Sequence, residues 1–221
     1  MGQWGPSPLT HFCGGDEGVR VNYATIKYCD IANGEGVRTS LFVSGCRRHC
    51  PYCFNEVAWN FTAGTPFTAA VEDEILASLE PTYIAGLSVL GGEPMEPENQ
   101  AGLVAFLERV RAVYPAGGPA AAGSAPAKTI WCYTGDTLDE LMPGGRHRTA
   151  VTERLLGCID VLVDGPYVQE LHDITLRFRG SSNQRVIDLA ATRAAAAAAG
   201  CTLDRAVRLW DDGAFYSTHS M

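Results

Sequence analysis

The sequence lacks an excess of basic residues, and this argues against one large class of function. Its 221 residues include 17 Lys and Arg against 25 Asp and Glu, which gives a formal net charge of -8 at pH 7. Proteins that bind nucleic acid need a basic face that neutralises phosphate groups. We therefore expect no nucleic-acid partner.

Long apolar runs and targeting signals are also lacking. No stretch reaches the about 18 consecutive apolar residues of a membrane-spanning helix, so we expect no membrane partner. Residues 1–10 have neither the basic start nor the apolar middle of a secretory signal. The eight cysteines, three of them close together, do not resemble a disulfide scaffold. We expect a cytoplasmic protein whose cysteines serve metal chemistry.

Strand-like and helix-like segments alternate along the chain and predict an α/β fold. Apolar or alternating runs predict strands over 21–28, 39–44, 84–90, 128–134 and 158–163. Helical spacing predicts helices over 67–80, 97–113 and 149–156, and a capping box predicts a short one at 137–140. Strands joined by helices favour parallel pairing with right-handed crossovers. Because these units are fewer than a closed barrel needs, we expect a partial, open βα barrel with parallel strands.

The ends of the chain and one internal stretch differ from this core. We expect a loose N-terminal extension over 1–20, a barrel domain over 21–189 and a C-terminal tail over 190–221. Residues 115–127 are rich in Ala, Gly and Pro, which predicts a flexible insertion. In the tail, residues 194–199 are helix-prone, and 205–210 predict an edge strand or an extended segment. Cys13 has no partner at metal-ligand spacing, and we interpret it as an incidental thiol.

Three cysteines lie in one short loop after the predicted strand 39–44. Cys46, Cys50 and Cys53 have the spacing C-x3-C-x2-C. Iron–sulfur clusters are usually held by four cysteine thiolates, whereas this loop supplies three. A [4Fe-4S] cluster held in this way keeps one iron without a protein ligand, and a small molecule can bind there. The spacing therefore indicates a catalytic cluster rather than a simple electron store.

The residues alone leave two other interpretations of this loop open. The three cysteines could hold zinc together with His49, His172 or another cysteine. They could also be free thiols of a cytoplasmic enzyme without a metal.

A second motif, Gly91-Gly92-Glu93-Pro94, follows the predicted strand 84–90. Glycines let backbone carbonyls approach a ligand closely, and such carbonyls can accept hydrogen bonds from an ammonium group. The same tetrapeptide is also common in ordinary turns. Because both motifs follow strands at the carboxyl edge of the expected sheet, we expect them to face the same site.

Several side chains near the motifs have two interpretations. Tyr52 could stack near an adenine ring or pack within its loop. Arg47 and Arg48 could tune the potential of a metal centre or form a solvated surface. Cys132 and Cys158 fall in predicted strands, and we expect both to be buried apolar residues.

Together these motifs resemble the radical S-adenosylmethionine (SAM) enzymes, and among them the activating proteins of anaerobic ribonucleoside-triphosphate reductase. The stretches that carry the closer resemblance are 30–38, 41–46, 53–55, 131–135, 162–166 and 179–185, which together span roughly residues 22–189. The cysteine motif, with an aromatic residue before its third cysteine, marks the superfamily. The late block Arg179-Gly180-Ser181-Ser182-Asn183-Gln184-Arg185 indicates the branch.

The resemblance implies a reaction and partners. Cys46, Cys50 and Cys53 would bind a [4Fe-4S] cluster, and SAM would bind the open iron through its amino and carboxylate groups. The enzyme would cleave SAM reductively to methionine and a 5′-deoxyadenosyl radical. That radical would abstract hydrogen from a backbone glycine of the large subunit of anaerobic ribonucleoside-triphosphate reductase. Reduced flavodoxin or a similar protein would supply the electron.

The resemblance also implies where SAM binds. The positions that match the family around SAM are Tyr52, Cys53, Phe54 and Gly92, and Gly91 and Glu93 complete the second motif. Thr134, Arg179 and Ser181 are candidates for holding the SAM carboxylate.

Three other functions remain open at this point. An activase of another glycyl-radical enzyme, such as pyruvate formate-lyase, belongs to the same class, but the short chain and the late block favour the reductase. The absence of a second, ferredoxin-type cluster motif also favours it. A zinc-stabilised binding module and a simple electron carrier are alternatives from other classes.

Overall fold

A computed structural model describes residues 21–116 and 127–210. The expected extension 1–20 with Cys13, most of the insertion 115–127 and the end of the tail from 211 onward lie outside these residues. The strands are β1 (Asn22–Asp30), β2 (Val37–Val43), β3 (Thr65–Pro66), β4 (Ile84–Gly91), β5 (Thr129–Tyr133), β6 (Val161–Asp164) and β7 (Arg185–Asp188). The helices are α1 (Ala69–Ser78), α2 (Pro97–Val113), α3 (Thr152–Cys158) and α4 (Leu189–Ala199). Short 3-10 helices are η1 (Glu56–Trp59), η2 (Leu138–Leu141), η3 (Gln169–Leu171) and η4 (Leu203–Arg205).

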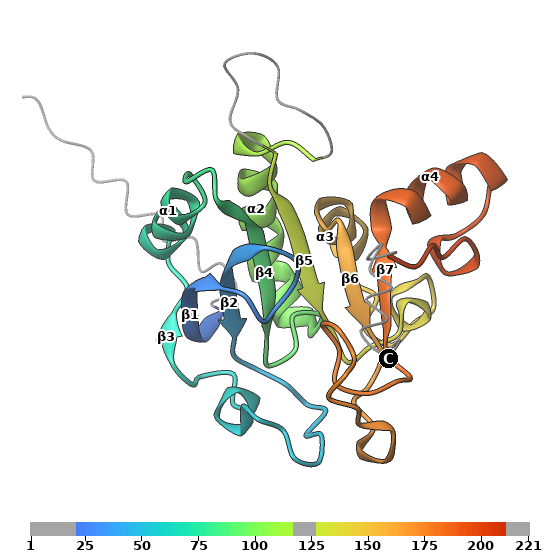
Figure 1. The fold of residues 1–221 in the computed structure, drawn as a ribbon, viewed down its shortest axis with the longest axis horizontal. Coiled ribbons are helices and arrows are strands. Elements are labelled where there is room, and N and C mark those ends of the chain that lie inside the picture. Colours follow the sequence, from blue (N-terminus) through green and yellow to red (C-terminus); the bar gives the residue numbers. More distant parts are fainter. Residues whose placement is uncertain (1–20, 117–126, 211–221) are drawn as a thin grey trace, which may run out of the picture.

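The strands form one open sheet in the order β3-β1-β2-β4-β5-β6-β7 (Figure 1). The four central strands, β2, β4, β5 and β6, pair in parallel, as the alternation of strands and helices predicts. The outer pairs β1–β2 and β6–β7 are antiparallel. Neither of these two connections carries a crossover helix, which parallel neighbours require. The expected α/β fold with a partial, open barrel is confirmed, and its parallel strands are confined to the centre of the sheet.

Most element boundaries agree with the prediction within a few residues, but one region is shifted. The expected helix 149–156 begins at Thr152, whose hydroxyl accepts a hydrogen bond from the Thr149 N–H, and runs on to Cys158. Cys158 therefore ends a helix, and the prediction that it lies in a strand is wrong. Cys132 lies in β5 as expected, and both cysteines are buried. The capping box at 137–140 is present, but it opens a 3-10 helix.

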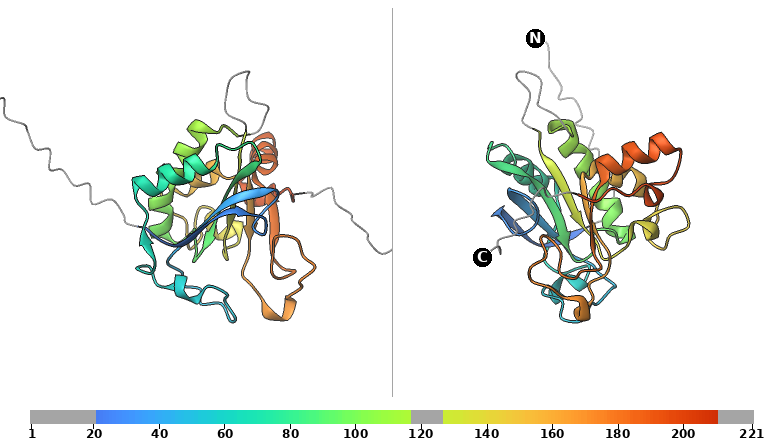
Figure 2. Two further views of the ribbon diagram at one scale, coloured as in Figure 1. Left: turned by 60° about the vertical axis from the view of Figure 1, so that its left-hand side comes forward. Right: turned by 45° about the vertical axis from the view of Figure 1, so that its right-hand side comes forward.

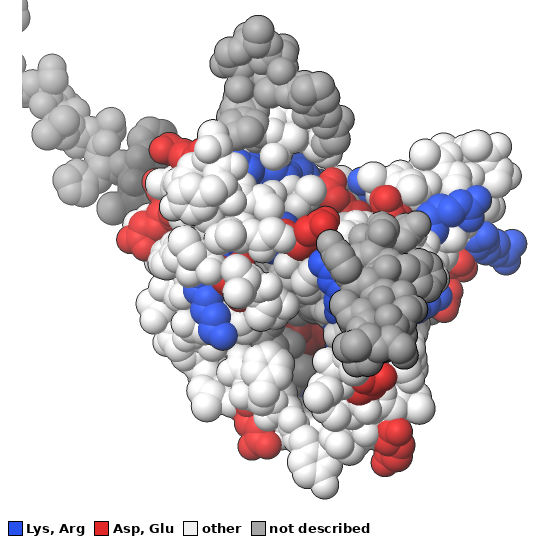
Figure 3. Space-filling model, viewed as in Figure 1, with Lys and Arg blue, Asp and Glu red and all other residues white. Residues whose placement is uncertain are grey.

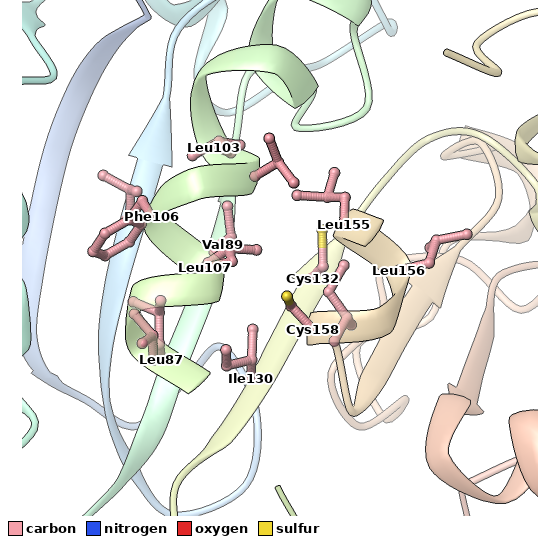
Figure 4. Packing of buried hydrophobic residues seen from close by; sticks show 14 of the residues in the cluster. Leu87, Val89, Leu103, Phe106, Leu107, Ile130, Cys132, Leu155, Leu156 and Cys158 are labelled. Atoms are coloured by element: carbon pink, nitrogen blue, oxygen red, sulfur yellow. The ribbon is translucent and has the colours of Figure 1, made fainter. Parts of the chain in front are cut away.

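The two faces of the sheet have different characters. One face packs against α1, α2 and α3 and contains the main apolar core (Figure 4). The other face carries a smaller apolar cluster with Trp131 and Val163, and it also buries polar side chains. Successive strand residues point to opposite faces, so Leu41 and Val43 belong to the core while Ser40 lies toward the second face. This second face leads to the functional site.

Arg38 joins the loop before β2 to the centre of the sheet. The side chain is fully buried, and burial lowers its pKa to about 10. Its guanidinium donates to the carbonyl oxygens of Leu87 and Thr129, both at 2.8 Å, and to Ser88 Oγ at 2.7 Å. Another N–H reaches the carbonyl of Glu35 at 3.1 Å. These bonds fix the loop that begins the region of family resemblance.

Replacing Arg38 by methionine is expected to destabilise the protein by about 3 kcal/mol, because several buried acceptors lose their donor together. Denaturant unfolding under anaerobic conditions measures this change. Arg109→Met is the matched control, since Arg109 is partly exposed and pairs with Asp73 at the surface. A variant at Arg38 that unfolds like the control would contradict the structural role assigned to this residue.

The segment after α4 returns to the sheet. The Trp210 N–H donates to the Val186 carbonyl at 2.9 Å, and Leu209 forms an isolated bridge with Ile187. The expectation of an edge strand or extended segment over 205–210 is confirmed in its extended form for residues 207–210, whereas Arg205 ends η4. The Trp210 ring packs edge-on against Trp131 and Phe178, with centroids at 5.2 and 5.9 Å.

Candidate active site and cluster-binding loop

The loops after the four parallel strands meet at one edge of the sheet, at the bottom of Figure 1. They enclose a cavity of about 580 Å³, within the usual size range of small-molecule sites. Its lining includes Cys46, Cys50 and Cys53 after β2, Gly91, Gly92 and Glu93 at the end of β4, Thr134 and Gly135 after β5, and Gly165 after β6. The expectation that the two motifs face the same site is confirmed.

The cysteine loop has a constrained backbone. His49 and Tyr52 adopt left-handed conformations, with φ values of 48° and 59°, which non-glycine residues rarely do. The base of the loop is fastened to η1, because the Gly45 N–H donates to the Ala58 carbonyl at 2.7 Å and the Cys46 N–H donates to the Trp59 carbonyl at 3.0 Å. All three cysteines of this loop line the cavity.

The thiols themselves lie in a low-polarity setting. Burial raises the pKa of Cys46 to about 11 and also raises the pKa of Cys50. A thiol whose pKa is raised stays protonated at neutral pH, whereas a bound metal favours the thiolate. The Asn55 N–H lies 3.4 Å from Cys53 Sγ and donates to it. Hydrogen bonds to ligand sulfurs are one of the means by which a protein adjusts the potential of a cluster.

This donor set fits a cluster better than a zinc ion. In residues 21–116 and 127–210, no group of three or more His, Cys, Asp or Glu side chains converges as the ligands of a single ion do. His49 stacks on Trp59 with ring centroids 4.5 Å apart, and His172 Nδ1 lies 2.9 Å from the Gly180 carbonyl oxygen. In a cluster each thiolate binds a different iron, and all three cysteines line the one cavity, which suits it.

The glycines of the second motif join the two strand ends. A Cβ atom on Gly92 would lie 2.5 Å from the Gly45 carbonyl oxygen, and one on Gly91 would lie 2.6 Å from backbone atoms of Val43. The Gly92 N–H donates to the Val43 carbonyl at 2.7 Å. The sequence predicted that these two glycines let backbone carbonyls approach a ligand. In the structure they also let the Gly-Gly-Glu-Pro segment pack directly on the cysteine loop.

The carboxylate of Glu93 is buried and is used within the protein. It accepts hydrogen bonds from Thr134 Oγ1 and the Gly135 N–H, both at 2.7 Å, and from the Met95 N–H at 2.9 Å. Burial, with the nearby charge of Asp136, raises the pKa of Glu93 to about 7. Glu93 therefore connects the end of β4 to the loop after β5.

Arg48 anchors the cysteine loop to the loop after β5. Its guanidinium forms an ion pair with the fully buried Asp136 and lies 3.5 Å from Glu93. Asp136 also contacts His147 Nδ1 at 2.5 Å and Arg146 at 3.2 Å. The alternative that Arg48 forms part of a solvated surface is wrong, because only 13% of its side chain is exposed. Its effect on the potential of a metal centre stays a prediction.

Arg47 is bound on the other side of the loop. Its backbone N–H and one guanidinium N–H donate to the buried carboxylate of Glu96, at 2.8 and 2.6 Å. A second ion pair joins it to Glu98 at 2.6 Å. About half of the side chain is exposed, with 56% of its area open to solvent. Both arginines of the motif thus fasten the cysteine loop to its surroundings.

Asn99 is a site residue that sequence reasoning missed. From the first turn of α2 its buried amide donates to the Glu93 carbonyl at 2.8 Å and to the Gly45 carbonyl at 3.2 Å. One side chain therefore holds both motifs at their backbones. The sequence did hold a sign of this role. Asn99 lies four residues before Leu103, on the apolar stripe of the helix, and a polar side chain buried there needs a specific partner.

The late block of the family resemblance forms one wall of the cavity. The Gln184 side chain accepts hydrogen bonds from the N–H groups of Gly180 and Ser181 and donates to the Gly165 carbonyl. Arg185 forms a bidentate pair with the buried Asp164, at 2.9 and 2.5 Å. The block therefore fixes the loop after β6 to the end of that strand.

The SAM-contact candidates have different positions. Thr134 and Arg179 line the cavity, but Ser181 is buried outside the lining, where its Oγ accepts a hydrogen bond from the Val168 N–H at 3.2 Å. Tyr52 and Phe54 lie at the mouth of the cavity, with 80% and 83% of their area exposed. The alternative that Tyr52 packs within its loop is wrong.

Comparison with known proteins agrees with this geometry. Residues 32–187 match the family model described as a 4Fe-4S single cluster domain. The chain is 41% identical over 168 residues to the anaerobic ribonucleoside-triphosphate reductase-activating protein of Escherichia coli K12, which covers 75% of this chain and 97% of that protein. The protein of that name from Salmonella typhi is 42% identical, over 71% of this chain and 92% of that one. The protein of that name from bacteriophage T4 is 33% identical, and the match covers 75% of this chain and 93% of the phage protein.

The fold and the cysteine loop define the class of protein as a radical SAM-type enzyme with a single 4Fe-4S cluster domain. Within this class, the chain belongs to the family of anaerobic ribonucleoside-triphosphate reductase-activating proteins. None of the helices in the described parts of the chain has the length and apolar character needed to cross a membrane.

Proposed function

We propose that this protein generates the glycyl radical on anaerobic ribonucleoside-triphosphate reductase by reductive cleavage of SAM. The observation that carries the proposal is the meeting of two strand-end motifs in one cavity, with three thiols on the wall and no fourth cysteine among the described residues that line it. Such a site has the donors for a cluster with one open iron and the space for a small cofactor beside it.

The cysteine loop would hold the cluster through Cys46, Cys50 and Cys53. When bound and reduced, the cluster supplies the electron that cleaves SAM to methionine and a 5′-deoxyadenosyl radical. Arg48 and Asn99 hold the loop in its position from two sides. Val163 and Phe178 give the cavity apolar surface, which would limit the access of water and protect a reactive radical from side reactions.

SAM would lie along the strand ends. We assign its contacts to Gly91, Gly92 and Glu93 through their backbones, and to Tyr52 and Phe54 at the mouth. The Glu93 carboxylate accepts hydrogen bonds from Thr134 and Gly135, and its backbone carbonyl accepts one from Asn99. We therefore assign the contact with the SAM ammonium to the backbone carbonyls of Gly91 and Gly92. Thr134 and Arg179 remain candidates for the SAM carboxylate, since both line the cavity. Reduced flavodoxin or a similar protein would donate the electron.

The partner would be the large subunit of the reductase, docked over the mouth of the cavity. Loops that contribute to the cavity or flank it carry several large apolar side chains that are exposed: Ile31, Tyr52, Phe54, Val57, Leu171 and Ile174. In Figure 3 the projecting lower part of the molecule is mostly uncharged, with a few acidic side chains. Figure 2 shows the loops after β2 and β6 projecting on the same side of the sheet. Exposed apolar patches with polar surroundings are typical of protein-binding sites.

The reaction can be tested directly. The reduced protein is incubated with SAM and the large reductase subunit, and electron paramagnetic resonance detects a glycyl radical. We expect this signal together with 5′-deoxyadenosine and methionine in equal amounts. Deoxyadenosine without a glycyl signal on the reductase would favour an activase of another glycyl-radical enzyme. The absence of both deoxyadenosine and the glycyl signal would reject the proposal.

Val57→Asp is expected to raise the reductase concentration needed for half-maximal activation about tenfold, because a charge would then be buried against the partner. Val57 is 73% exposed and does not line the cavity, so SAM cleavage by the protein alone should be unchanged. Tyr83→Asp is the control, since Tyr83 is 64% exposed just before β4, at the opposite edge of the sheet. Equal activation by both variants would place the docking surface elsewhere.

A further inference from the structure

The cysteine loop is held from the start of α2 by a carboxylate that is completely buried. Glu96 directly precedes Pro97, the first residue of α2, and none of it is exposed to solvent. A polar residue at this position often caps its own helix, but the Glu96 side chain makes no capping hydrogen bond. Its two oxygens instead accept hydrogen bonds from the Arg47 N–H at 2.8 Å and from the Arg47 guanidinium at 2.6 Å. The carboxylate therefore serves the cysteine loop and not its own helix.

The bond to the Arg47 N–H positions Cys46. Arg47 follows Cys46 directly, so this N–H belongs to the peptide group that joins the two residues. On the other side of the cysteine, the Cys46 N–H donates to the Trp59 carbonyl at 3.0 Å. The backbone of Cys46 is thus held at both of its peptide groups, and Glu96 provides one of the two contacts.

The negative charge of Glu96 is more than Arg47 needs as a partner. The Arg47 guanidinium also pairs with Glu98 at 2.6 Å, so one cation faces two carboxylates. Of the side-chain area, 56% is exposed in Arg47 and 45% in Glu98, against 1% in Glu96. Water and salt screen the two exposed charges, whereas a buried charge is screened much less. A poorly screened negative charge therefore lies beside the peptide group of Cys46.

A neutral side chain could make the same backbone contact. The Arg47 N–H needs one acceptor, and an amide oxygen at position 96 would supply it. A buried carboxylate costs free energy of desolvation, which its ion pair offsets only in part. Because the charge is not required to hold the loop, it points to an electrostatic role. A fixed charge beside a ligand acts on the reduction potential of a cluster, since reduction adds an electron to it.

We propose that Glu96 positions Cys46 and lowers the reduction potential of the cluster that the cysteine loop would hold. A lower potential makes the reduced cluster a stronger donor of the electron that cleaves SAM. This inference rests on the proposed function and deepens it, because it names a positioning residue that adjusts the electron-transfer step.

Glu96→Gln tests the inference, since it removes the charge and keeps an acceptor for the Arg47 N–H. We expect its iron content to stay within twofold of the wild type. The midpoint potential of the cluster should rise, as followed by electron paramagnetic resonance during an anaerobic redox titration without SAM. The expected shift is about tenfold in the equilibrium constant of reduction, or about 59 mV for one electron. Glu96→Ala, which also removes the acceptor, should lower the iron content severalfold.

Glu98→Gln is the matched control. It makes the same substitution at the other carboxylate that pairs with Arg47, but at a position that is partly exposed. Because solvent screens this charge, the midpoint potential of the control should equal that of the wild type.

Three results would overturn the inference. The first is a midpoint potential of Glu96→Gln equal to that of the wild type, and the second is an equal shift in Glu96→Gln and Glu98→Gln. The third is loss of the fold or of the iron in Glu96→Gln, because the residue would then serve assembly alone. Failure of the proposed function is distinct from all three, since it would appear as a wild-type protein that holds a cluster and does not cleave SAM.

Discussion

Replacing Cys50 by alanine is expected to abolish SAM cleavage while the fold is retained. Cys50 is one of three thiols on the cavity wall, and a cluster with only two protein ligands from this loop would be lost or inactive. The residue is only partly buried and makes few core contacts, so the sheet should form without it. The same result is expected for Cys46→Ala and Cys53→Ala. Deoxyadenosine production under anaerobic conditions, iron content and circular dichroism measure the three parts of this prediction.

Cysteines outside the loop provide the controls. Cys201→Ser and Cys29→Ser should leave iron content and SAM cleavage nearly unchanged, because neither residue lines the cavity. The same is expected for Cys13→Ser, whose position lies outside the described residues. Continued deoxyadenosine production by Cys50→Ala would show that the cluster has been assigned to the wrong thiols.

Replacing Arg48 by methionine is expected to destabilise the protein by about 3 kcal/mol and to lower its iron content severalfold. Arg48 is the cation between Asp136 and Glu93, which are both buried. Removing Arg48 would leave the two buried carboxylates with less compensation in a medium of low polarity, with only the contacts of Asp136 to Arg146 and His147 remaining. The cysteine loop would also lose its attachment to the loop after β5. Anaerobic denaturant unfolding and iron analysis measure the two effects.

Arg146→Met separates this role from a general effect of charge. Arg146 reaches the same carboxylate of Asp136 at 3.2 Å, but half of its side chain is exposed. Surface ion pairs contribute about 0–1 kcal/mol, so this variant should keep its iron and most of its stability. If both variants unfold alike and bind iron equally, the buried ion pair does not hold the cluster loop.

The elements whose apolar residues recur at regular spacing could be predicted from the sequence. The apolar strands and the amphipathic helices α1 and α2 were predictable because burial imposes a repeat that a short stretch of sequence displays. The strand ends then placed the two motifs in one cavity by topology alone. The cysteine spacing limited the chemistry of the site to an iron–sulfur cluster, a zinc ion or free thiols, and the later motifs favoured the cluster.

The rest depends on contacts between residues far apart in the chain. Asn99 binds the Gly45 carbonyl 54 positions away, and Asp136 pairs with Arg48 across 88 positions. No local pattern encodes such partners, so Arg48 could equally have been a surface residue. The start of α3 was misplaced for a similar reason, because the hydroxyls of Thr149 and Thr152 both donate to the Gln100 side chain, 49 and 52 positions away. The antiparallel pairing of β7 with β6 could not be predicted either, because the long loop that joins the two strands has no periodic pattern.

The central claim is that three cysteines of this chain leave one iron open and that SAM binds there. Electron–nuclear double resonance on the reduced protein, with SAM labelled in its amino and carboxylate groups, tests it most directly. The account predicts hyperfine coupling between both labels and the cluster. A cluster whose irons all carry ligands from this chain, with no coupling to labelled SAM, would contradict it.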